Sequence, residues 1–150
     1  MRSTKLFLRV LIVSALLFLN LDGAANEITV YKTTTCGCCG IWVDHLKSSG
    51  FQVTVKNVDS TAEYQEKFGV PQKLQSCHTA VVDGYTIEGH VPASEIQRLL
   101  KERPKAKGLA VPGMPMGSPG MEAGGRSDKY AVLLFQADGK TSVYREYAAR

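Results

Sequence analysis

The chain carries little net charge and contains no run of consecutive basic residues. Its formal net charge is +4, from 18 lysine and arginine residues against 14 aspartate and glutamate residues. Proteins that bind nucleic acid need a concentrated positive patch, because contacts to phosphate supply most of their affinity. The basic residues between positions 101 and 107 alternate with other residues, and the C-terminal dipole of a helix accounts for them. We therefore expect no nucleic-acid partner.

The sequence also lacks an apolar run long enough to span a membrane. Its longest run, residues 10–19, is interrupted by Ser14 and reaches about half of the roughly 20 residues that a spanning helix needs. Basic residues precede this run and small residues follow it up to Ala25, the pattern of a secretory signal peptide. We therefore predict a cleaved signal peptide over residues 1–25 and a periplasmic protein without membrane contact after cleavage. An uncleaved N-terminal anchor is the alternative.

Hydrophobic periodicity predicts one α/β domain over residues 26–150. Alternating, β-branched segments predict strands, and Asp83-Gly84 and Asp138-Gly139 predict the turns of two hairpins. The expected strands cover residues 27–33, 51–58, 79–82, 85–89, 130–136 and 141–147. The expected helices are a short one from Ile41 that ends at Gly50, one from Asp59 or Ser60 to Phe68, and one from Pro92 that ends before Pro104.

The order of these elements is strand, helix, strand, helix, strand, strand, helix, which is the order of the thioredoxin fold. A crossover helix makes the first two strands parallel, and a tight turn makes the next two antiparallel. Residues 107–125 are rich in glycine, proline and methionine, so we expect an irregular loop there. The C-terminal hairpin, residues 129–147, should join the sheet or pack over it. The predicted fold class is a thioredoxin-like mixed α/β sheet with flanking helices, this loop and this hairpin.

The sequence has few cysteines, 4 in all, and three of them lie within four consecutive residues. Cys36, Cys38 and Cys39 lie between a predicted strand and a predicted helix, whose N-terminus favours thiolates. Cys36 and Cys39 have the C-x-x-C spacing of a redox pair. Cys77 precedes the third strand, and in a thioredoxin-like sheet that loop faces the C-x-x-C turn. We therefore predict that all four thiols converge.

A cluster of thiols favours a soft metal ion. Thiolates select Cu(I), zinc or iron–sulfur clusters. The neighbouring Cys38 and Cys39 cannot easily orient both sulfurs onto one tetrahedral zinc ion, and the spacing fits no ferredoxin pattern. Thiolate sulfur can bridge two coppers. We therefore predict that Cys36, Cys38, Cys39 and Cys77 bind Cu(I), and more than one ion of it.

Further candidate ligands are His78, His90, Met114 and Met116. Imidazole and thioether groups suit copper, although methionine also fills gaps in apolar cores. Met121 is a weaker candidate of the same kind. His45 is expected to be a surface histidine of the first helix. No residue is assigned a catalytic role.

Three separated segments resemble the bacterial copper-resistance family called CopG: TTTCGCCGIWVDHL, LQSCHTAVVDGYTIEGHVPASEI and GLAVPGMPMGSPGME. The resemblance covers most of residues 27–122. It implies a periplasmic, thioredoxin-like protein that binds copper through cysteines and contributes to copper tolerance. The family's motifs fall on these residues: Cys36, Cys38 and Cys39, then Cys77 and His78, then Met114 and Met116. The resemblance leaves open whether the protein turns copper over or only holds it.

Three hypotheses of different classes follow. The first is a periplasmic protein that holds Cu(I) for copper resistance, with or without Cu(I)/Cu(II) redox activity, and that exchanges copper with other periplasmic copper-handling proteins. The second is a thioredoxin-like thiol–disulfide oxidoreductase that uses Cys36 and Cys39. The third is a structural role, with two disulfides or a zinc ion fastening the loop.

Overall fold

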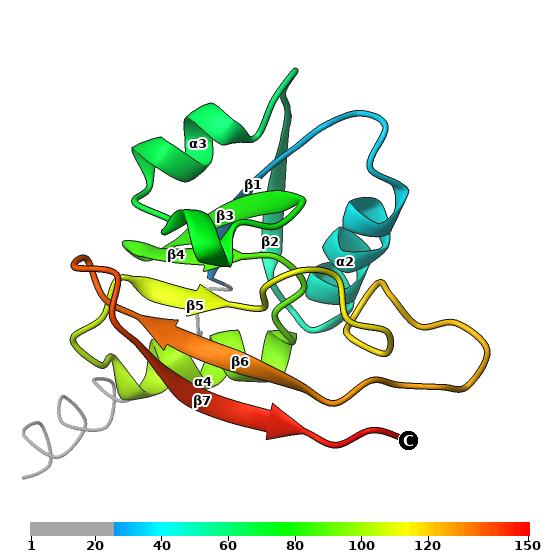
Figure 1. Ribbon diagram of the computed structural model, residues 1–150. Coiled ribbons are helices and arrows are strands. Elements are labelled where there is room, and N and C mark those ends of the chain that lie inside the picture. Colours follow the sequence, from blue (N-terminus) through cyan, green and yellow to red (C-terminus); the bar gives the residue numbers. More distant parts are fainter. Residues whose placement is uncertain (1–25) are drawn as a thin grey trace, which may run out of the picture.

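The computed structural model describes residues 26–150, and the predicted signal peptide lies outside the described residues. These residues form a 7-stranded sheet in the order β2-β1-β3-β4-β5-β6-β7 (Figure 1). The strands are β1 (Glu27–Lys32), β2 (Gln52–Asn57), β3 (His78–Val82), β4 (Tyr85–Glu88), β5 (Gly108–Ala110), β6 (Tyr130–Phe135) and β7 (Thr141–Tyr147). The helices are α2 (Gly37–Ser48), α3 (Ala62–Lys67), the 3-10 turn η1 (Gln72–Leu74) and α4 (Ala93–Glu102).

The strand directions agree with the expectation from sequence. Strand β1 pairs in parallel with β2 and antiparallel with β3, and β3 and β4 form the predicted hairpin. Strand β6 pairs with β5, so the C-terminal hairpin β6–β7 extends the sheet. The predicted mixed α/β architecture is confirmed, and its thioredoxin-like character stays a prediction from the order of the elements.

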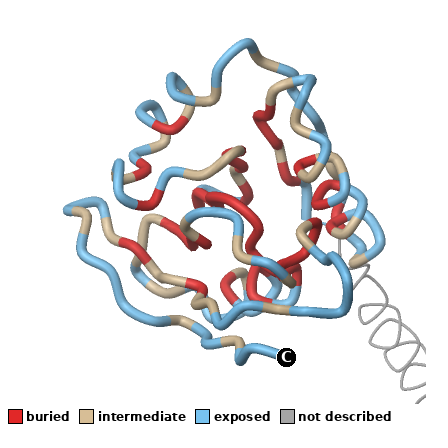
Figure 2. The backbone as a smooth tube through the Cα atoms, turned by 45° about the vertical axis from the view of Figure 1, so that its right-hand side comes forward, coloured by how far each residue is buried: buried red, intermediate tan, exposed pale blue. Residues whose placement is uncertain are grey.

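The main core lies on the face of the sheet that α2 and α4 cover. Trp42 and Leu46 of α2 and Ile96 and Leu99 of α4 are fully buried there against alternate residues of the strands. The Trp42 indole N–H donates to the carbonyl oxygen of Val91 at 2.9 Å, which ties α2 to the segment after β4. Figure 2 shows the buried residues at the centre of the molecule and the last strand largely exposed. Helix α2 is therefore fixed by its burial.

The opposite face of the sheet carries α3 and a smaller core. The Tyr64 ring of α3 stacks on Tyr31 of β1 with 4.3 Å between ring centroids. Val70 and Leu74 pack with Ala110 and Phe135 nearby. Because side chains alternate along a strand, each central strand contributes side chains to both cores.

Three expectations about local structure need correction. Helix α2 begins at Gly37 rather than near Ile41, so Cys38 and Cys39 lie in its first turn. Burial of Cys39 on the same stripe as Trp42, Val43 and Leu46 explains the extra turn.

The irregular loop expected over residues 107–125 is regular at its start, because Gly108–Ala110 forms β5 between β4 and β6. Helix α3 begins at Ala62 with Thr61 as its N-cap, although the Ser60 hydroxyl accepts a bond from the Ala62 N–H at 3.2 Å. No helix among residues 26–150 is long and apolar enough to cross a membrane.

Candidate metal centre

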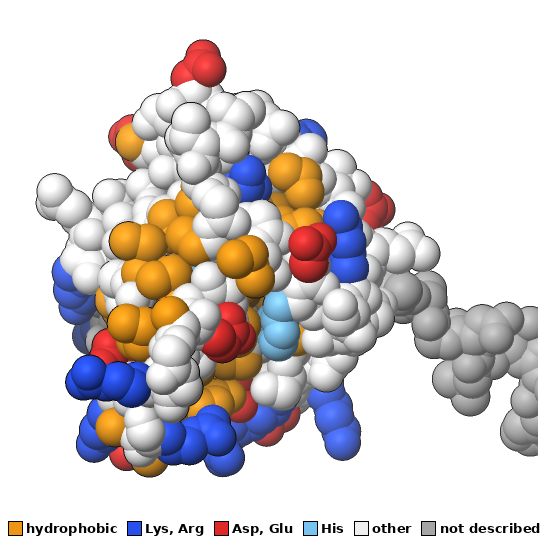
Figure 3. All heavy atoms as spheres, turned by 90° about the vertical axis from the view of Figure 1, so that its right-hand side faces the viewer, with side chains coloured by type: hydrophobic (Ala, Val, Ile, Leu, Met, Phe, Trp, Pro, Cys, Tyr) orange, Lys and Arg blue, Asp and Glu red, His pale blue; other side chains and the backbone are white. Residues whose placement is uncertain are grey.

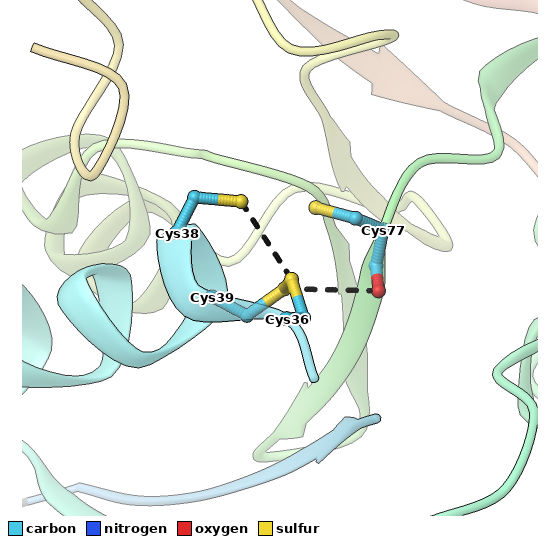
Figure 4. Close-up of side chains that lie close together, drawn as sticks. All are labelled: Cys36, Cys38, Cys39 and Cys77. Carbon is cyan, nitrogen blue, oxygen red and sulfur yellow. Dashed lines mark hydrogen bonds between the residues drawn. A yellow bond between two sulfur atoms is a disulfide. The ribbon is translucent and has the colours of Figure 1, made fainter. Parts of the chain in front are cut away.

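Four sulfur atoms from two distant segments meet at one end of the sheet. Cys36 is the N-cap of α2, Cys38 and Cys39 lie in its first turn, and Cys77 immediately precedes β3. Their Sγ atoms all lie within 4.8 Å of one another. Figure 4 shows the side chain of Cys77 extending from the sheet side toward those at the start of α2. The predicted convergence of the thiols is confirmed.

The four sulfurs are not equivalent. Cys36 and Cys39 form a disulfide, whereas Cys38 and Cys77 are free thiols. The Cys38 Sγ lies 3.6 Å from the Cys36 Sγ. From the sequence we expected four thiols that do not pair readily into disulfides. In the structure, two of the four cysteines are bonded to each other. The alternative with two disulfides is not what the structure contains.

His90 places a nitrogen atom beside the free thiol of Cys77. Its Nδ1 lies 2.8 Å from the carbonyl oxygen of Pro119, and because a carbonyl oxygen can only accept, Nδ1 carries the proton. Burial lowers the pKa of His90, which favours the neutral ring. Its Nε2 is then an acceptor, and it lies 3.2 Å from the Cys77 Sγ. Such a carbonyl contact is how proteins fix the tautomer of a metal-binding histidine.

His78 is fully buried between α2 and His90. Its ring centroid lies 4.3 Å from that of Trp42, and its Nδ1 lies 3.4 Å from the Cys77 Sγ. Burial, and then the neighbouring His90, lower the pKa of His78 to about 3, so the ring is neutral at physiological pH. Its Nε2 is buried and has no hydrogen-bond partner among residues 26–150. Both histidines thus offer neutral imidazoles, and with Cys77 they form a second group of closely spaced ligand atoms.

Cys77 needs a cation before it can act as a thiolate. Burial, and then the neighbouring Cys38 sulfur, raise the pKa of the Cys77 thiol to about 11. At neutral pH the thiol is therefore protonated in the metal-free protein, and a bound metal ion must displace that proton.

A buried carboxyl group holds the segment that carries Cys77. Glu88 of β4 is fully buried and lies on the face of the sheet opposite to α2. It accepts bonds from the Ser76 N–H at 2.6 Å, the Gln65 amide at 2.8 Å and the Thr79 hydroxyl at 2.6 Å. Burial raises the pKa of Glu88 to about 7. We call Glu88, Gln65, Ser76 and Thr79 the carboxyl network.

Residues 112–121, the methionine loop, lie over the start of α2. The Ser76 hydroxyl donates to the carbonyl oxygen of Gly113 at 2.6 Å, and Pro119 accepts from His90. A Cβ atom on Gly120, whose φ is +87°, would come within 2.8 Å of the Cys38 carbonyl oxygen. The loop therefore approaches the cysteines as closely as glycine permits.

The methionines of this loop are not part of the buried centre. Met114 is 53% exposed and Met116 is 38% exposed. Figure 3 shows hydrophobic side chains gathered on the face that carries α2 and this loop. Met121 is half-buried.

His45 is not the plain surface histidine that the sequence suggested. Its Nε2 accepts a bond from the Ala93 N–H at 3.0 Å, in the first turn of α4. Burial lowers the pKa of His45. It therefore joins two helices and lies outside both groups of ligand atoms.

Two solved structures are similar to this chain over most of its length. Both are described as copper resistance protein copG, in forms 2 and 1, and each is 46% identical in sequence. The first gives a TM-score of 0.78, with 82% of this chain and 98% of that chain covered. The second gives 0.77, with 81% and 97% covered. This chain belongs to the CopG family of copper resistance proteins.

A further match agrees with this assignment. Residues 74–121 match a family model described as a protein of unknown function, DUF411. In this CopG-family chain that segment holds Cys77, both buried histidines and the methionine loop, but not the cysteines of α2. No curated protein matches the chain.

Sequence reasoning missed the carboxyl network and the contact of Gly120. Glu88 is an acidic residue in a strand whose residues are all buried. An acidic residue in an otherwise buried strand was the available signal, because a buried carboxyl group needs hydrogen-bond partners. The partners of Glu88 come from α3, the loop before β3 and β3 itself, so no local pattern could have identified them.

Proposed function

We propose that this protein holds Cu(I) in a cysteine-thiolate site in the periplasm and thereby contributes to copper resistance. Four Sγ atoms within 4.8 Å of one another are the observation that carries the proposal. Thiolates are soft ligands, and the neutral Nε2 of His90 adds a borderline donor. A cluster of this kind suits more than one copper ion, because thiolate sulfur can bridge.

The residues around the cluster fit copper as cargo. Cys36, Cys38, Cys39 and Cys77 would hold the ions, with His90 and His78 beside Cys77. The Nδ1 of His78 lies 3.4 Å from the Cys77 Sγ and is the nitrogen placed to reach a bound ion. Met114 and Met116 are exposed at the surface of the loop, where thioethers would receive Cu(I) from other periplasmic copper-handling proteins.

Export to the periplasm is part of the proposal. It rests on the signal-peptide pattern of residues 1–25 and on a thiol chemistry that an oxidising compartment can switch between thiol and disulfide. A change between Cu(I) and Cu(II) at the site is proposed with it.

Copper content of cysteine variants tests the function. Cys77→Ala and Cys38→Ala come from the two separate segments and should lower copper content about equally, by roughly half or more of the ions, because thiolates are shared between ions. Elemental analysis of protein from copper-fed cells measures this content. Ser48→Ala, on the exposed side of α2, is the matched control and should change nothing. Unchanged copper content in Cys77→Ala would contradict a shared site.

A second function is favoured by the disulfide itself. A bonded Cys36–Cys39 pair with a half-exposed first sulfur and a buried second one suits a thiol–disulfide oxidoreductase. Reduction of insulin by the metal-free protein tests this. Turnover that persists in Cys38→Ala and Cys77→Ala would favour the oxidoreductase over the copper protein.

A further inference from the structure

We propose that Lys32 supplies the positive charge that balances the copper-loaded cysteine cluster, and that this charge raises the affinity of the cluster for Cu(I). This inference rests on the proposed function, because it requires copper at the four cysteines. It assigns a role to a buried lysine that makes no ion pair within residues 26–150.

The burial of Lys32 is costly in the metal-free protein. Lys32 is the last residue of β1 and is 8% exposed. Its ammonium group donates to the carbonyl oxygen of Thr33 at 2.8 Å, and no carboxylate of residues 26–150 pairs with it. A neutral carbonyl group replaces only part of the hydration that a buried ammonium loses. A negative charge that arrives with the metal would account for this lysine.

Lys32 lies on the face of the sheet that carries the cluster. The preceding residue, Tyr31, stacks on Tyr64 of α3, so the alternation of side chains along β1 directs Lys32 to the face that α2 covers. Lys32 is paired directly with His78 of β3, whose Nδ1 lies 3.4 Å from the Cys77 Sγ. The lysine is therefore next to the segment that carries Cys77.

A second contact connects Lys32 to the start of α2. The Thr33 carbonyl oxygen that accepts from the Lys32 ammonium group also accepts from the Cys36 N–H at 3.3 Å. No acidic residue lies in the first turn of α2, so no side chain there offsets the partial positive charge of the helix N-terminus. A full charge and a helix dipole thus both favour negative charge at the sulfurs.

Uptake of copper makes the cluster more negative. One Cu(I) ion brings one positive charge, and the two thiols that bind it release two protons to solvent, so the charge of the site falls by one. Two S–H bonds break, two Cu–S bonds form, and no electron is transferred. A nearby ammonium group stabilises this anionic product more than it stabilises the neutral thiols. Lys32 therefore shifts the binding equilibrium toward the loaded state.

The experiment compares three variants with wild type, all in reduced form under anaerobic conditions. Lys32→Met removes the charge and keeps an unbranched side chain, whereas Lys32→Arg keeps the charge. Lys56→Met is the matched control, because Lys56 is exposed on β2 and lies over the Tyr31 ring, on the other face of the sheet. Competition with the chelator bicinchoninate measures the affinity for Cu(I). Urea unfolding measures the stability of the metal-free protein.

We expect Lys32→Met to bind Cu(I) about tenfold more weakly than wild type, because one nearby opposite charge shifts such an equilibrium by this order. The urea midpoint of this variant without metal should stay level or rise, since methionine leaves no unpaired charge in the interior. Lys32→Arg should bind within about threefold of wild type, because arginine is always charged. Lys56→Met should bind as wild type does. A lysine with a purely structural role would lose affinity and stability together.

Three results would overturn the inference and leave the copper site intact. They are equal affinity of Lys32→Met and wild type, a parallel loss of affinity and stability in Lys32→Met, and binding by Lys32→Arg as weak as that by Lys32→Met. In the last two cases the side chain would act through its packing rather than its charge. Wild type that takes up no Cu(I), as measured by elemental analysis, would instead remove the proposed function itself.

Discussion

The helix side of the cluster (Cys36, Cys38 and Cys39) and its sheet side (Cys77, His78 and His90) hold their ligand atoms by different means. On the helix side, three sulfurs come from four consecutive residues at the start of α2, and a disulfide already joins two of them. On the sheet side, the consecutive residues Cys77 and His78 lie at the start of β3 and His90 follows β4, and both histidines are fully buried.

The two sides therefore differ in how firmly the surrounding structure holds their sulfur and nitrogen atoms. Sulfurs on one short segment can change partners with little movement, which suits a change of redox state. On the sheet side, Glu88 holds the Ser76 N–H next to Cys77, and the Pro119 carbonyl oxygen holds the His90 ring in place. The helix side thus contains the bonded cysteine pair, and the sheet side contains the two fully buried histidines.

The largest effect should follow from removing the carboxyl group that supports the sheet side. Glu88→Ala leaves the Ser76 N–H, the Gln65 amide and the Thr79 hydroxyl without their buried acceptor. We expect the free energy of unfolding to fall by about 3 to 5 kcal/mol, from unpaired polar groups and a cavity. Urea unfolding of the metal-free protein measures it. Glu66→Ala, exposed on α3, is the control and should change stability by less than about 0.5 kcal/mol. Equal stability of the two variants would refute the supporting role.

The next effect is a dependence of stability on pH that Glu88 causes. The pKa of Glu88 is raised by burial from 4.5 to about 7, so between these values the folded protein holds a proton that the unfolded chain has released. The free energy of unfolding should therefore fall as pH rises through this window, by an amount on the order of 3 kcal/mol.

His78 acts in the opposite sense at lower pH. Its pKa is lowered from 6.5 to about 3, so its contribution to stability is lost as pH falls through that range. Glu88→Gln separates the two groups, because glutamine keeps an acceptor but cannot ionise. The difference in unfolding free energy between wild type and Glu88→Gln, measured from pH 4.5 to 8, should move in favour of the variant as pH rises. Parallel curves would show that Glu88 does not titrate in this way.

A smaller effect is expected where the methionine loop meets the helix side. Gly120→Ala places a Cβ atom 2.8 Å from the Cys38 carbonyl oxygen, at a φ of +87°. Gly113→Ala is the matched control, since its φ is +70° and nothing lies within 4 Å of the added atom. Both variants carry the cost of about 1 kcal/mol for a positive φ. Gly120→Ala should lose roughly 1 kcal/mol more, measured by urea unfolding. An equal loss of stability in the two variants would show that the methionine loop is not in tight contact with α2 at Gly120.

Much of this arrangement could be predicted from sequence because its signals are local. Alternating and β-branched segments predicted the strands β1 to β4. Asp83-Gly84 and Asp138-Gly139 predicted the two hairpins. Convergence of Cys77 with the other cysteines followed from strand order alone, since connections at the same end of a sheet lie together. The boundary of α2 was missed because Gly37 and Gly40 resemble a turn, and only the burial of Cys39 favours the helix.

The parts that sequence did not predict depend on contacts between distant segments. The bond from His90 to Pro119 spans 29 positions, and the bond from Gln65 to Glu88 spans 23. The strand β5 was missed because its three residues, Gly108–Ala110, are too few to show a period. The disulfide between Cys36 and Cys39 was one of several pairings that the spacing allowed.

The last prediction separates the buried histidine beside Cys77 from the histidine that joins the helices. His90→Ala removes the Nε2 that lies 3.2 Å from the Cys77 Sγ, so Cu(I) affinity should fall about tenfold, as measured by competition with a Cu(I) chelator. His45→Gln keeps an acceptor for the Ala93 N–H and lies outside the cluster, so its affinity should equal that of wild type. An unchanged affinity in His90→Ala would mean that the imidazole only positions the methionine loop through Pro119. The sheet side would then contribute only the Cys77 sulfur to the binding of copper.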